Sequence, residues 1–466
     1  MSARGIGLTL ALVLAGGACR VPPKGGLAEV TRLLDDRGAR GLRWNQSLRE
    51  DDDARRALDA LLDEELTPAR AVQIALVGSA AIQATLERLG VAQADAIQAG
   101  LLKNPTIGVH PGLPIGSPSW TGVAWEVSFA MELLDVLVLP LRKKLAKLEL
   151  ERARLTVAAD LWVVVTDVRT AYYEALAAQQ RLGLQRTIAE SAEVGAEFAA
   201  RQEHGGALSE LALATEQGSY AQTRLDLVRA ERDAVSARER LVRQMGLWVG
   251  HARMKLPAKL PMLPAVDPDV DALERLAITQ RLDLRAAESE AALFERTVKM
   301  AKGTRFLTGL SIGGDAHREP EGRKVIGPSV ALELPIFDQG QARIAKLVAE
   351  TRRARRQADA LAVEIRSTVR ERASALLAAR SLSDYLVRVV MPLRERTVML
   401  AQQQYNAMLL GLPQLLAAKQ GEIAAWRDYL DSVRDYWVAR AELERAVGGA
   451  LEQHGDEHMS AAKEIP

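Results

Sequence analysis

The chain has 466 residues, of which 48% are hydrophobic and 26% are charged, with 61 lysines and arginines against 60 aspartates and glutamates. This balance gives no reason to expect nucleic acid as a partner. The single cysteine excludes an internal disulfide and any metal site built from several cysteines. Aromatic residues make up 4% of the chain and strong helix formers dominate it, so we expect a protein made mostly of long helices.

The N-terminal residues have the pattern of an export signal that ends at the single cysteine. A basic residue precedes a short apolar stretch, which is too short to span a bilayer and ends in small residues. Cys19 lies where a bacterial lipoprotein signal requires a cysteine, although Gly16 replaces the usual leucine. We therefore expect residues 1–18 to be a lipoprotein signal peptide, Cys19 to carry lipid, and residues 19–46 to form a tether. An ordinary signal peptide with an incidental cysteine is the alternative.

Two halves of the chain show the same order of patterns, which predicts an internal repeat over residues 47–246 and 276–449. Each half has a helical pattern, then two short segments of alternating apolarity, then very long helical stretches. Between the halves, residues 247–275 contain four prolines and are predicted to be an irregular connector. Residues 450–466 are polar and are predicted to be a disordered tail.

The opening helix of the first half is predicted to begin with Thr67 as its cap and Pro68 in its first turn, and to run to Leu102. Its counterpart in the second half is predicted over residues 281–302. A continuous helix from about residue 141 to 204 would be about 95 Å long. Because compact domains rarely hold such a rod, we expect an elongated assembly packed in coiled-coil fashion.

Four short segments alternate apolar residues with small or acidic ones. They cover residues 107–110, 121–132, 306–313 and 329–334. This alternation suits the strands of a transmembrane barrel, and it suits equally a half-buried sheet resting on a helical core. Four strands cannot close a barrel, since small closed barrels need about eight, so a barrel would require several copies of the chain.

Several motifs in this order resemble the TolC family of outer-membrane efflux channels over about residues 60–450. They are Leu66-Thr67-Pro68, Asn104-Pro105, Ala171-Tyr172-Tyr173-Glu174, Arg281-Leu282-Asp283-Leu284-Arg285 and Leu334-Pro335-Ile336-Phe337-Asp338-Gln339-Gly340. Residues 404–411 and 435–437 also resemble the branch of this family associated with heavy-metal or copper export.

The resemblance implies a mostly helical fold with a small β part. Three copies of the chain would form one twelve-stranded transmembrane β-barrel in the outer membrane, continued through the periplasm by a coiled-coil-like tunnel of twelve helices. The implied function is a passive exit duct of a tripartite efflux system, with heavy-metal ions as a candidate cargo. The implied partners are outer-membrane lipid, a periplasmic adaptor protein and an inner-membrane pump. Such a duct needs no cofactor and catalyses no reaction.

Two other functions fit parts of the pattern. A periplasmic adaptor lipoprotein is also exported and built on a long helical hairpin, but it usually has one hairpin flanked by β-rich domains, whereas this chain has two. A coiled-coil scaffold without a pore would not need the alternating strands. No arrangement of nucleophile and base, phosphate loop or zinc motif indicates an enzyme.

The resemblance assigns the breaks in the long helices to periplasmic tips that dock the adaptor and gate the tunnel. The residues assigned to the tips are Gly205, Gly206, Ser209, Glu210 and Leu211 in the first half, and Gly411, Leu412, Pro413 and Gln414 in the second. Family members often place an aspartate shortly after the glycine. Here Glu210 is in the comparable place of the first tip and Gln414 in that of the second, so a trimer would offer three carboxylates instead of six.

Three acidic residues are predicted to face the lumen of the barrel: Glu126, Glu132 and Glu333. They would favour cations, although solvation of the inner wall explains them as well. His454 and His458 have a spacing that suits one face of a helix, but Gly455 and the polar tail around them argue against a metal site. We therefore predict no resident metal.

Overall fold

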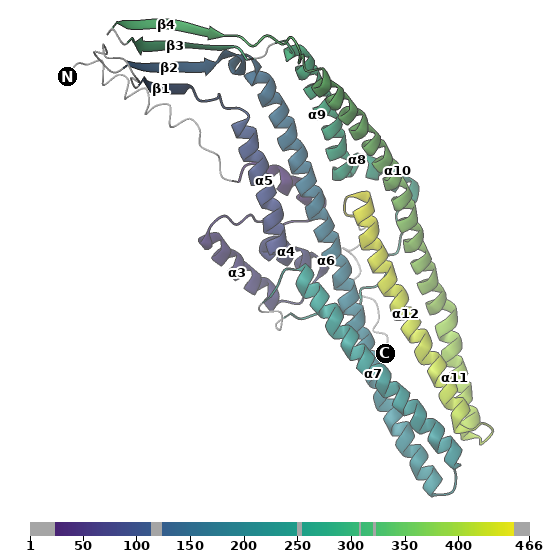
Figure 1. The fold of residues 1–466 in the computed structure, drawn as a ribbon. Coiled ribbons are helices and arrows are strands. Elements are labelled where there is room, and N and C mark those ends of the chain that lie inside the picture. Colours follow the sequence, from purple (N-terminus) through teal and green to yellow (C-terminus); the bar gives the residue numbers. More distant parts are fainter. Residues whose placement is uncertain (1–23, 113–123, 249–253, 307–308, 320–322, 452–466) are drawn as a thin grey trace. The chain divides into compact units, whose positions relative to one another are not determined.

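The protein is described from a computed structural model that covers residues 24–112, 124–248, 254–306, 309–319 and 323–451 (Figure 1). Cys19, His454 and His458 lie outside these described residues. The chain divides into two compact units. Unit 1 comprises Met1–Ala28, Glu87–Val157 and Asp283–Leu361, and unit 2 comprises Glu29–Leu86, Ala158–Leu282 and Ala362–Pro466.

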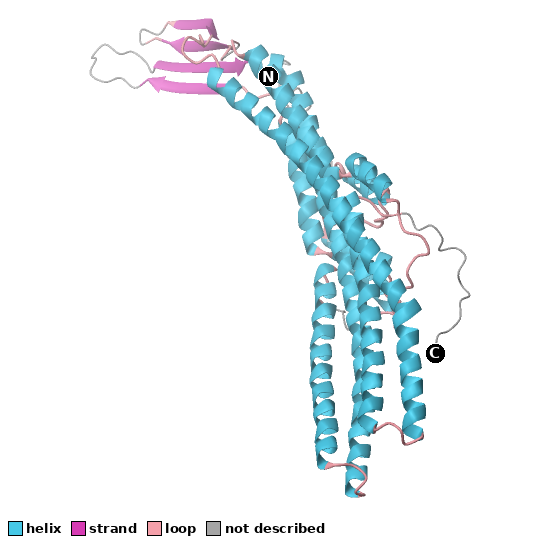
Figure 2. Cartoon of the chain, turned by 90° about the vertical axis from the view of Figure 1, so that its right-hand side faces the viewer, coloured by secondary structure: helices cyan, strands magenta, loops and turns pink. Residues whose placement is uncertain are grey.

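Unit 1 contains one four-stranded antiparallel sheet with its strands in chain order (Figures 1 and 2). The strands are β1 (Thr106–Gly112), β2 (Ala124–Glu132), β3 (Ser311–Arg318) and β4 (Lys324–Ala331). The first two occur where alternation predicted them. The predictions for residues 306–313 and 329–334 were misplaced: the third strand begins later and the fourth ends earlier. The sequence Gly313-Gly314-Asp315 has little strand propensity, and pairing with β2 holds it in the sheet.

Long helices enter and leave this sheet. Helix α6 (Leu133–His204) begins directly after β2, with no turn between them, and so starts earlier than the predicted start at about residue 141. The Leu133 N–H donates to the Leu310 carbonyl at 2.9 Å, which holds the start of α6 against the residue before β3. Helix α9 (Leu282–Thr304) precedes β3, and α10 (Gln341–Tyr385) follows β4. Arg355 of α10 pairs with Glu295 of α9.

Unit 2 is built from helices. It contains α3 (Leu48–Asp63), α4 (Pro68–Gly78), α7 (Glu210–Gln244), α8 (Val270–Gln280), α11 (Met391–Asn406) and α12 (Leu412–Val447), with parts of α5 (Ala80–Gln98), α6 and α10. The predicted start at Thr67 is confirmed, because its hydroxyl accepts from the Arg70 N–H at 3.2 Å. The predicted continuous helix to Leu102 was wrong, because α4 and α5 meet at Ser79 with a bend of 55°. Gly246 packs so closely on Ser79 that a Cβ there would lie 2.6 Å from the Ser79 Cα.

The helices of the described residues differ from membrane-spanning helices in length or in apolarity, apart from one bent pair. Within the described residues, no single helix is both long and apolar enough, and the bent pair α4–α5 is long and apolar enough in combination. Ile74 and Leu76 of this pair are fully buried in unit 2.

The core of unit 2 joins α6 and α12 through aromatic side chains. Tyr173 stacks on Trp437 with ring centroids 5.1 Å apart, and Tyr172 meets Tyr173 edge to face. The Tyr172 hydroxyl donates to the Leu66 carbonyl at 3.0 Å. Burial raises the pKa of Tyr172 to about 12, since the phenolate would lose its hydration, and the nearby Glu65 carboxylate adds to this.

The proline-rich segment is held against the helices of unit 2 by its own carbonyl groups. Residues 254–269 contain no helix or strand, and α8 begins at Val270. The Trp437 indole N–H donates to the Pro261 carbonyl at 2.9 Å, Gln179 to that of Pro257 at 3.1 Å, and Arg380 to that of Pro264 at 2.7 Å. Side chains thus satisfy the backbone groups that a helix would have satisfied internally.

The predicted tether, residues 19–46, is part of unit 2 from Glu29 onward. It contains helix α2 (Leu27–Asp35), whose Val30 and Leu34 are fully buried, and Trp44 is 3% exposed. The Arg37 guanidinium donates to the Gly448 carbonyl at 2.8 Å and to the Gln280 carbonyl at 2.6 Å. The expectation of a free tether is corrected for these residues, because several of their side chains are buried in the core of unit 2. Their composition alone did not indicate this burial.

A wide turn joins α10 to α11. Residues Leu386–Val390 form a π-helical turn, in which the Met391 N–H bonds to the Leu386 carbonyl five residues earlier. Pro392 follows directly, and its ring lacks an N–H and crowds the carbonyl four residues before it. The wider turn accommodates this proline inside a long helical run.

Candidate functional site

The register of the sheet separates two faces of different character. One face carries large apolar residues. They include Ile107, Val109, Trp125, Val127, Phe129, Met131, Ile312, Ile326 and Val330. Ile326 is 85% exposed and Ile107 and Val330 are each 71% exposed. Exposed apolar surface that continues across several strands marks contact with a membrane or with another protein.

The opposite face carries small, polar and ionisable residues. The register places Glu126 and Glu132 on this face, in the alternation that the sequence predicted. Lys103 binds the Glu132 carboxylate at 2.6 Å and lies 3.8 Å from Asp135. Because this hydrogen bond and the nearby carboxylates favour the ammonium form, the pKa of Lys103 is raised. Glu132 is therefore part of an ion-paired cluster where the sheet meets α6.

Glu333 does not lie on a strand, which corrects its predicted place beside Glu126. Strand β4 ends at Ala331, and Pro335 soon afterwards provides no N–H for a ladder hydrogen bond. Glu333 instead lines a cavity of about 360 Å³ together with Arg305 and Arg343.

The break between α6 and α7 is a tight, fully bonded helix end. The Gly206 N–H donates to the Glu203 carbonyl at 2.8 Å and the Ala207 N–H to the Gln202 carbonyl at 2.9 Å. This pattern requires a left-handed residue, and Gly206 supplies it with φ of +74°. The Ser209 hydroxyl then caps α7 by accepting from the Ala212 N–H at 3.3 Å.

The break between α11 and α12 has the same geometry without a glycine at its centre. The Met408 N–H donates to the Tyr405 carbonyl at 2.9 Å and the Leu409 N–H to the Gln404 carbonyl at 2.9 Å. Met408 takes the left-handed conformation, with φ of +60°. Gly411 is the residue before the first turn of α12 and has an extended backbone. Both turns lie toward the same end of unit 2 (Figures 1 and 2).

This geometry corrects the match between the two tips. Met408 corresponds to Gly206, and Gly411 to Ser209, because each pair has the same place in its turn. Leu412 therefore corresponds to Glu210, and Gln414 lies two residues further along. The sequence comparison matched Gly411 to the glycines of the first turn because both turns contain glycine. No residue pattern indicated that Met408 would be left-handed.

The turns also expose large apolar side chains. Leu211 is 79% exposed, Met408 is 94% exposed and Leu409 is 79% exposed. Glu210, next to Leu211 in the first turn of α7, is exposed as well. The surface of these two turns in unit 2 therefore combines exposed apolar side chains with an exposed carboxylate.

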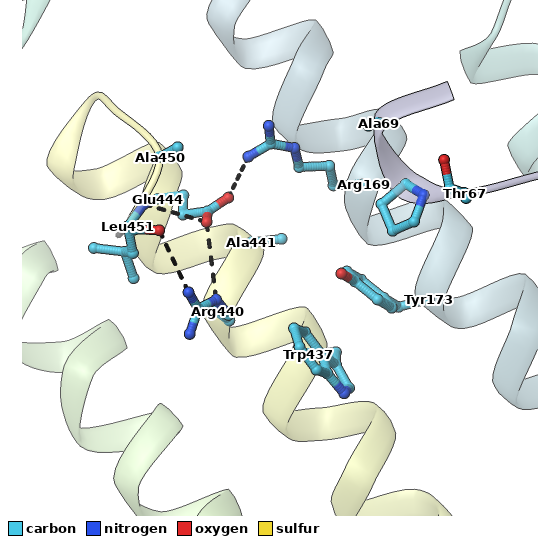
Figure 3. Close-up of a pocket in the computed structure, with 11 residues that line it drawn as sticks. Thr67, Ala69, Arg169, Tyr173, Trp437, Arg440, Ala441, Glu444, Ala450 and Leu451 are labelled. Atoms are coloured by element: carbon cyan, nitrogen blue, oxygen red, sulfur yellow. Dashed lines mark hydrogen bonds and ion pairs between the residues drawn. The ribbon is translucent and has the colours of Figure 1, made fainter. Parts of the chain in front are cut away.

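A cavity of about 400 Å³ near the end of α12 is lined by two arginines around one carboxylate (Figure 3). Arg169 of α6 forms an ion pair with Glu444, and Arg440 lies 3.9 Å from the same carboxylate. Glu444 also accepts from the Leu451 N–H at 3.3 Å. All three charged side chains are largely buried, so this cluster fixes the end of α12 to α6.

Metal ligands do not gather into a ready-made site. Across the parts of the chain that the structure describes, no group of three or more histidine, cysteine, aspartate or glutamate side chains is arranged to hold a metal ion.

Several known proteins resemble this chain in sequence or in fold. No protein-family model matches the chain. The cobalt-zinc-cadmium resistance protein CzcC of Cupriavidus metallidurans is 26% identical over 306 residues, which cover 64% of this chain and 72% of that protein. The Campylobacter jejuni CmeC outer membrane channel aligns with a TM-score of 0.70 and 16% identity, over 89% of this chain and 90% of that one.

A second solved structure agrees. The outer membrane protein VceC of Vibrio cholerae aligns with a TM-score of 0.66 and 16% identity, over 85% of this chain and 97% of that one. The sequence relative and the shared fold point the same way as the motifs. The chain has the fold of these outer membrane channels, and part of its sequence is similar to that of CzcC.

Proposed function

We propose that this protein is a passive exit duct, through which a tripartite efflux system releases its substrates from the periplasm to the exterior. The observation that carries this proposal is the sheet, which has an exposed apolar face and an opposite face of small and polar residues. Four strands are too few to enclose a pore, since small closed barrels need about eight. Three copies, each adding four strands, would form one twelve-stranded barrel in the outer membrane.

The proposed trimer uses the two halves of the chain in the same way. Residues 47–246 and 276–449 each contribute a helix, two strands and a long helical hairpin, so the trimer would continue its barrel as twelve long helices in the periplasm. Acylation of Cys19 after removal of residues 1–18 would anchor each copy to the outer membrane.

The tips are the proposed docking and gating site. Their exposed Leu211, Met408 and Leu409 offer apolar contacts to a periplasmic adaptor, which would link the duct to an inner-membrane pump. Glu210 would place three carboxylates at the entrance of a trimer. The name of CzcC supports cobalt, zinc and cadmium ions as candidate cargo for this chain as well. The pump supplies the energy, and the duct itself catalyses no reaction.

Single-channel conductance of the purified protein in planar bilayers tests this proposal. We expect a cation-preferring pore whose preference weakens in Glu210→Gln, because that substitution removes the carboxylate at the entrance. Glu197→Gln is the control, since Glu197 is a nearby exposed carboxylate that pairs with Arg201 at 3.2 Å. A folded protein that is not trimeric and forms no pore would overturn the proposal and favour a periplasmic adaptor.

A further inference from the structure

We propose that His110, Glu126 and His317 form a weak binding site for divalent transition-metal ions on the polar face of the sheet, with Asp315 orienting His317. This inference rests on the proposed function and deepens it, because it names where a metal cargo would contact the wall of the duct.

The sheet register brings these residues into one row. Glu126 of β2 is the direct partner of His110 on β1 and of His317 on β3. Directly opposed residues of antiparallel strands have Cβ atoms about 5 Å apart, so Glu126 is close to each histidine. The two histidines are on opposite sides of β2, and their side chains would rotate toward Glu126 to share one ion. All four residues line a hollow of about 530 Å³ near the strand ends that lead into the hairpins.

The donor set selects a class of ion. Imidazole nitrogen with carboxylate oxygen suits zinc, cobalt and related ions, whereas magnesium prefers oxygen ligands and water. His317 Nδ1 lies 3.3 Å from Asp315 Oδ2. A histidine whose Nδ1–H bonds to a carboxylate keeps the lone pair of Nε2 for a metal, an arrangement that recurs around protein-bound zinc.

The surroundings leave the row open to an ion. Gly112 and Ala124, which pair with each other on the same face, are too small to cover it. Arg318 and Lys324 are nearby cations that strand alternation puts on the apolar face. Of the two, Arg318 also lines the hollow, together with Glu319, whose carboxylate pairs with Arg323. His317 and Asp315 have side chains that are 38% and 32% exposed, so solvent and ions can reach them.

Weak binding is what a duct requires. Within the described ranges the ligands are not already gathered around one point, so an ion would be held by two or three groups that must rotate toward it. A pore conducts when its sites bind an ion well enough to admit it and loosely enough to release it. Closure of three sheets into one barrel would repeat the row three times around the lumen.

Calorimetric titration of Zn²⁺ into the full-length protein in detergent tests the site. We expect the double variant His110→Ala/His317→Ala to lower the Zn²⁺ affinity of the sheet site at least about tenfold. Loss of a residue that only hydrogen-bonds to a metal ligand already lowers affinity by about tenfold or more, and loss of a ligand should cost at least as much. His454→Ala/His458→Ala is the matched control for the other histidine pair, and Mg²⁺ is the control ion. Zn²⁺ affinity that is unchanged in the sheet variant, or lost only in the tail variant, would overturn the site.

Two further measurements separate the site from other effects. The variant Glu126→Gln separates loss of binding from loss of folding, and a conductance measurement separates the metal site from the proposed duct. Glu126→Gln retains the size of the side chain, and we expect it to weaken Zn²⁺ binding while the protein stays assembled. If the protein conducts K⁺ but Zn²⁺ neither binds at the sheet nor slows the current, the site is wrong and the duct stands. If Zn²⁺ binding depends on the sheet histidines but the folded protein is not trimeric and forms no pore, the duct is wrong and the site stands.

Discussion

Met408 holds a backbone conformation that nearly always belongs to glycine. A left-handed conformation costs a residue with a side chain about 1–2 kcal/mol. We therefore expect Met408→Gly to stabilise the turn by up to about 1 kcal/mol, and Gly206→Ala to destabilise the equivalent turn by about the same amount. Hydrogen exchange of the amides at 407–409 and 205–207 measures both changes. Equal protection in Met408→Gly and the unaltered chain would contradict this assignment of strain.

Glu444 neutralises two buried guanidinium groups. Glu444→Ala would leave Arg169 and Arg440 without their carboxylate, and removal of one partner from a buried ion pair costs about 3–5 kcal/mol. Glu442→Ala on the same helix is the control, since Glu442 pairs with the half-exposed Arg372 at 2.6 Å and should cost about 1 kcal/mol or less. The urea concentration at which helical circular dichroism is half lost compares the two. A similar shift in both variants would show that burial does not set the cost.

At the scale of the elements, the contact between α6 and the segment before α4 has a pH signature. Burial holds the pKa of Tyr172 at about 12, above its value of about 10 in an unfolded chain. Between these values the unfolded chain releases the proton while the folded chain keeps it, so the free energy of unfolding falls as pH rises. We expect a shallower fall in Tyr172→Phe, measured by urea unfolding from pH 9 to about 12. The same substitution at Tyr385, which is 58% exposed, is the control, and an equal change in both would contradict the assignment.

The elements also show what the sequence could and could not predict. The start of α4 followed from Thr67 and Pro68, and β1 and β2 followed from alternation, because these signals are local. Strand β3 did not, because its glycine-rich residues owe their conformation to pairing with a strand almost two hundred residues earlier. The left-handed conformation of Met408 was equally hidden, since it depends on the hydrogen bonds that end α11 and not on the preference of the residue.

At the scale of the whole molecule, the two faces of the sheet should respond oppositely to charge. Val127 and Ser128 are neighbours at the middle of β2 and lie on the apolar and the polar face. We expect Val127→Arg to oppose insertion into the outer membrane by about 2–4 kcal/mol, the cost of an arginine facing lipid at mid-depth. Ser128→Arg should be tolerated. The amount of protein recovered in the outer-membrane fraction checks this, and equal loss of both variants would contradict the assignment of the faces.

The hydrogen bond from Arg37 to the Gly448 carbonyl also limits when unit 2 can finish folding. It joins residues 411 positions apart, and unit 2 is assembled from three separate stretches of the chain. A chain that emerges from its N-terminus cannot complete this unit until nearly all of it has been delivered. Contacts so distant in sequence form slowly, because a long loop must close before they contribute any stability. During that interval the apolar strands and helix faces remain uncovered, so the incomplete chain is prone to aggregate.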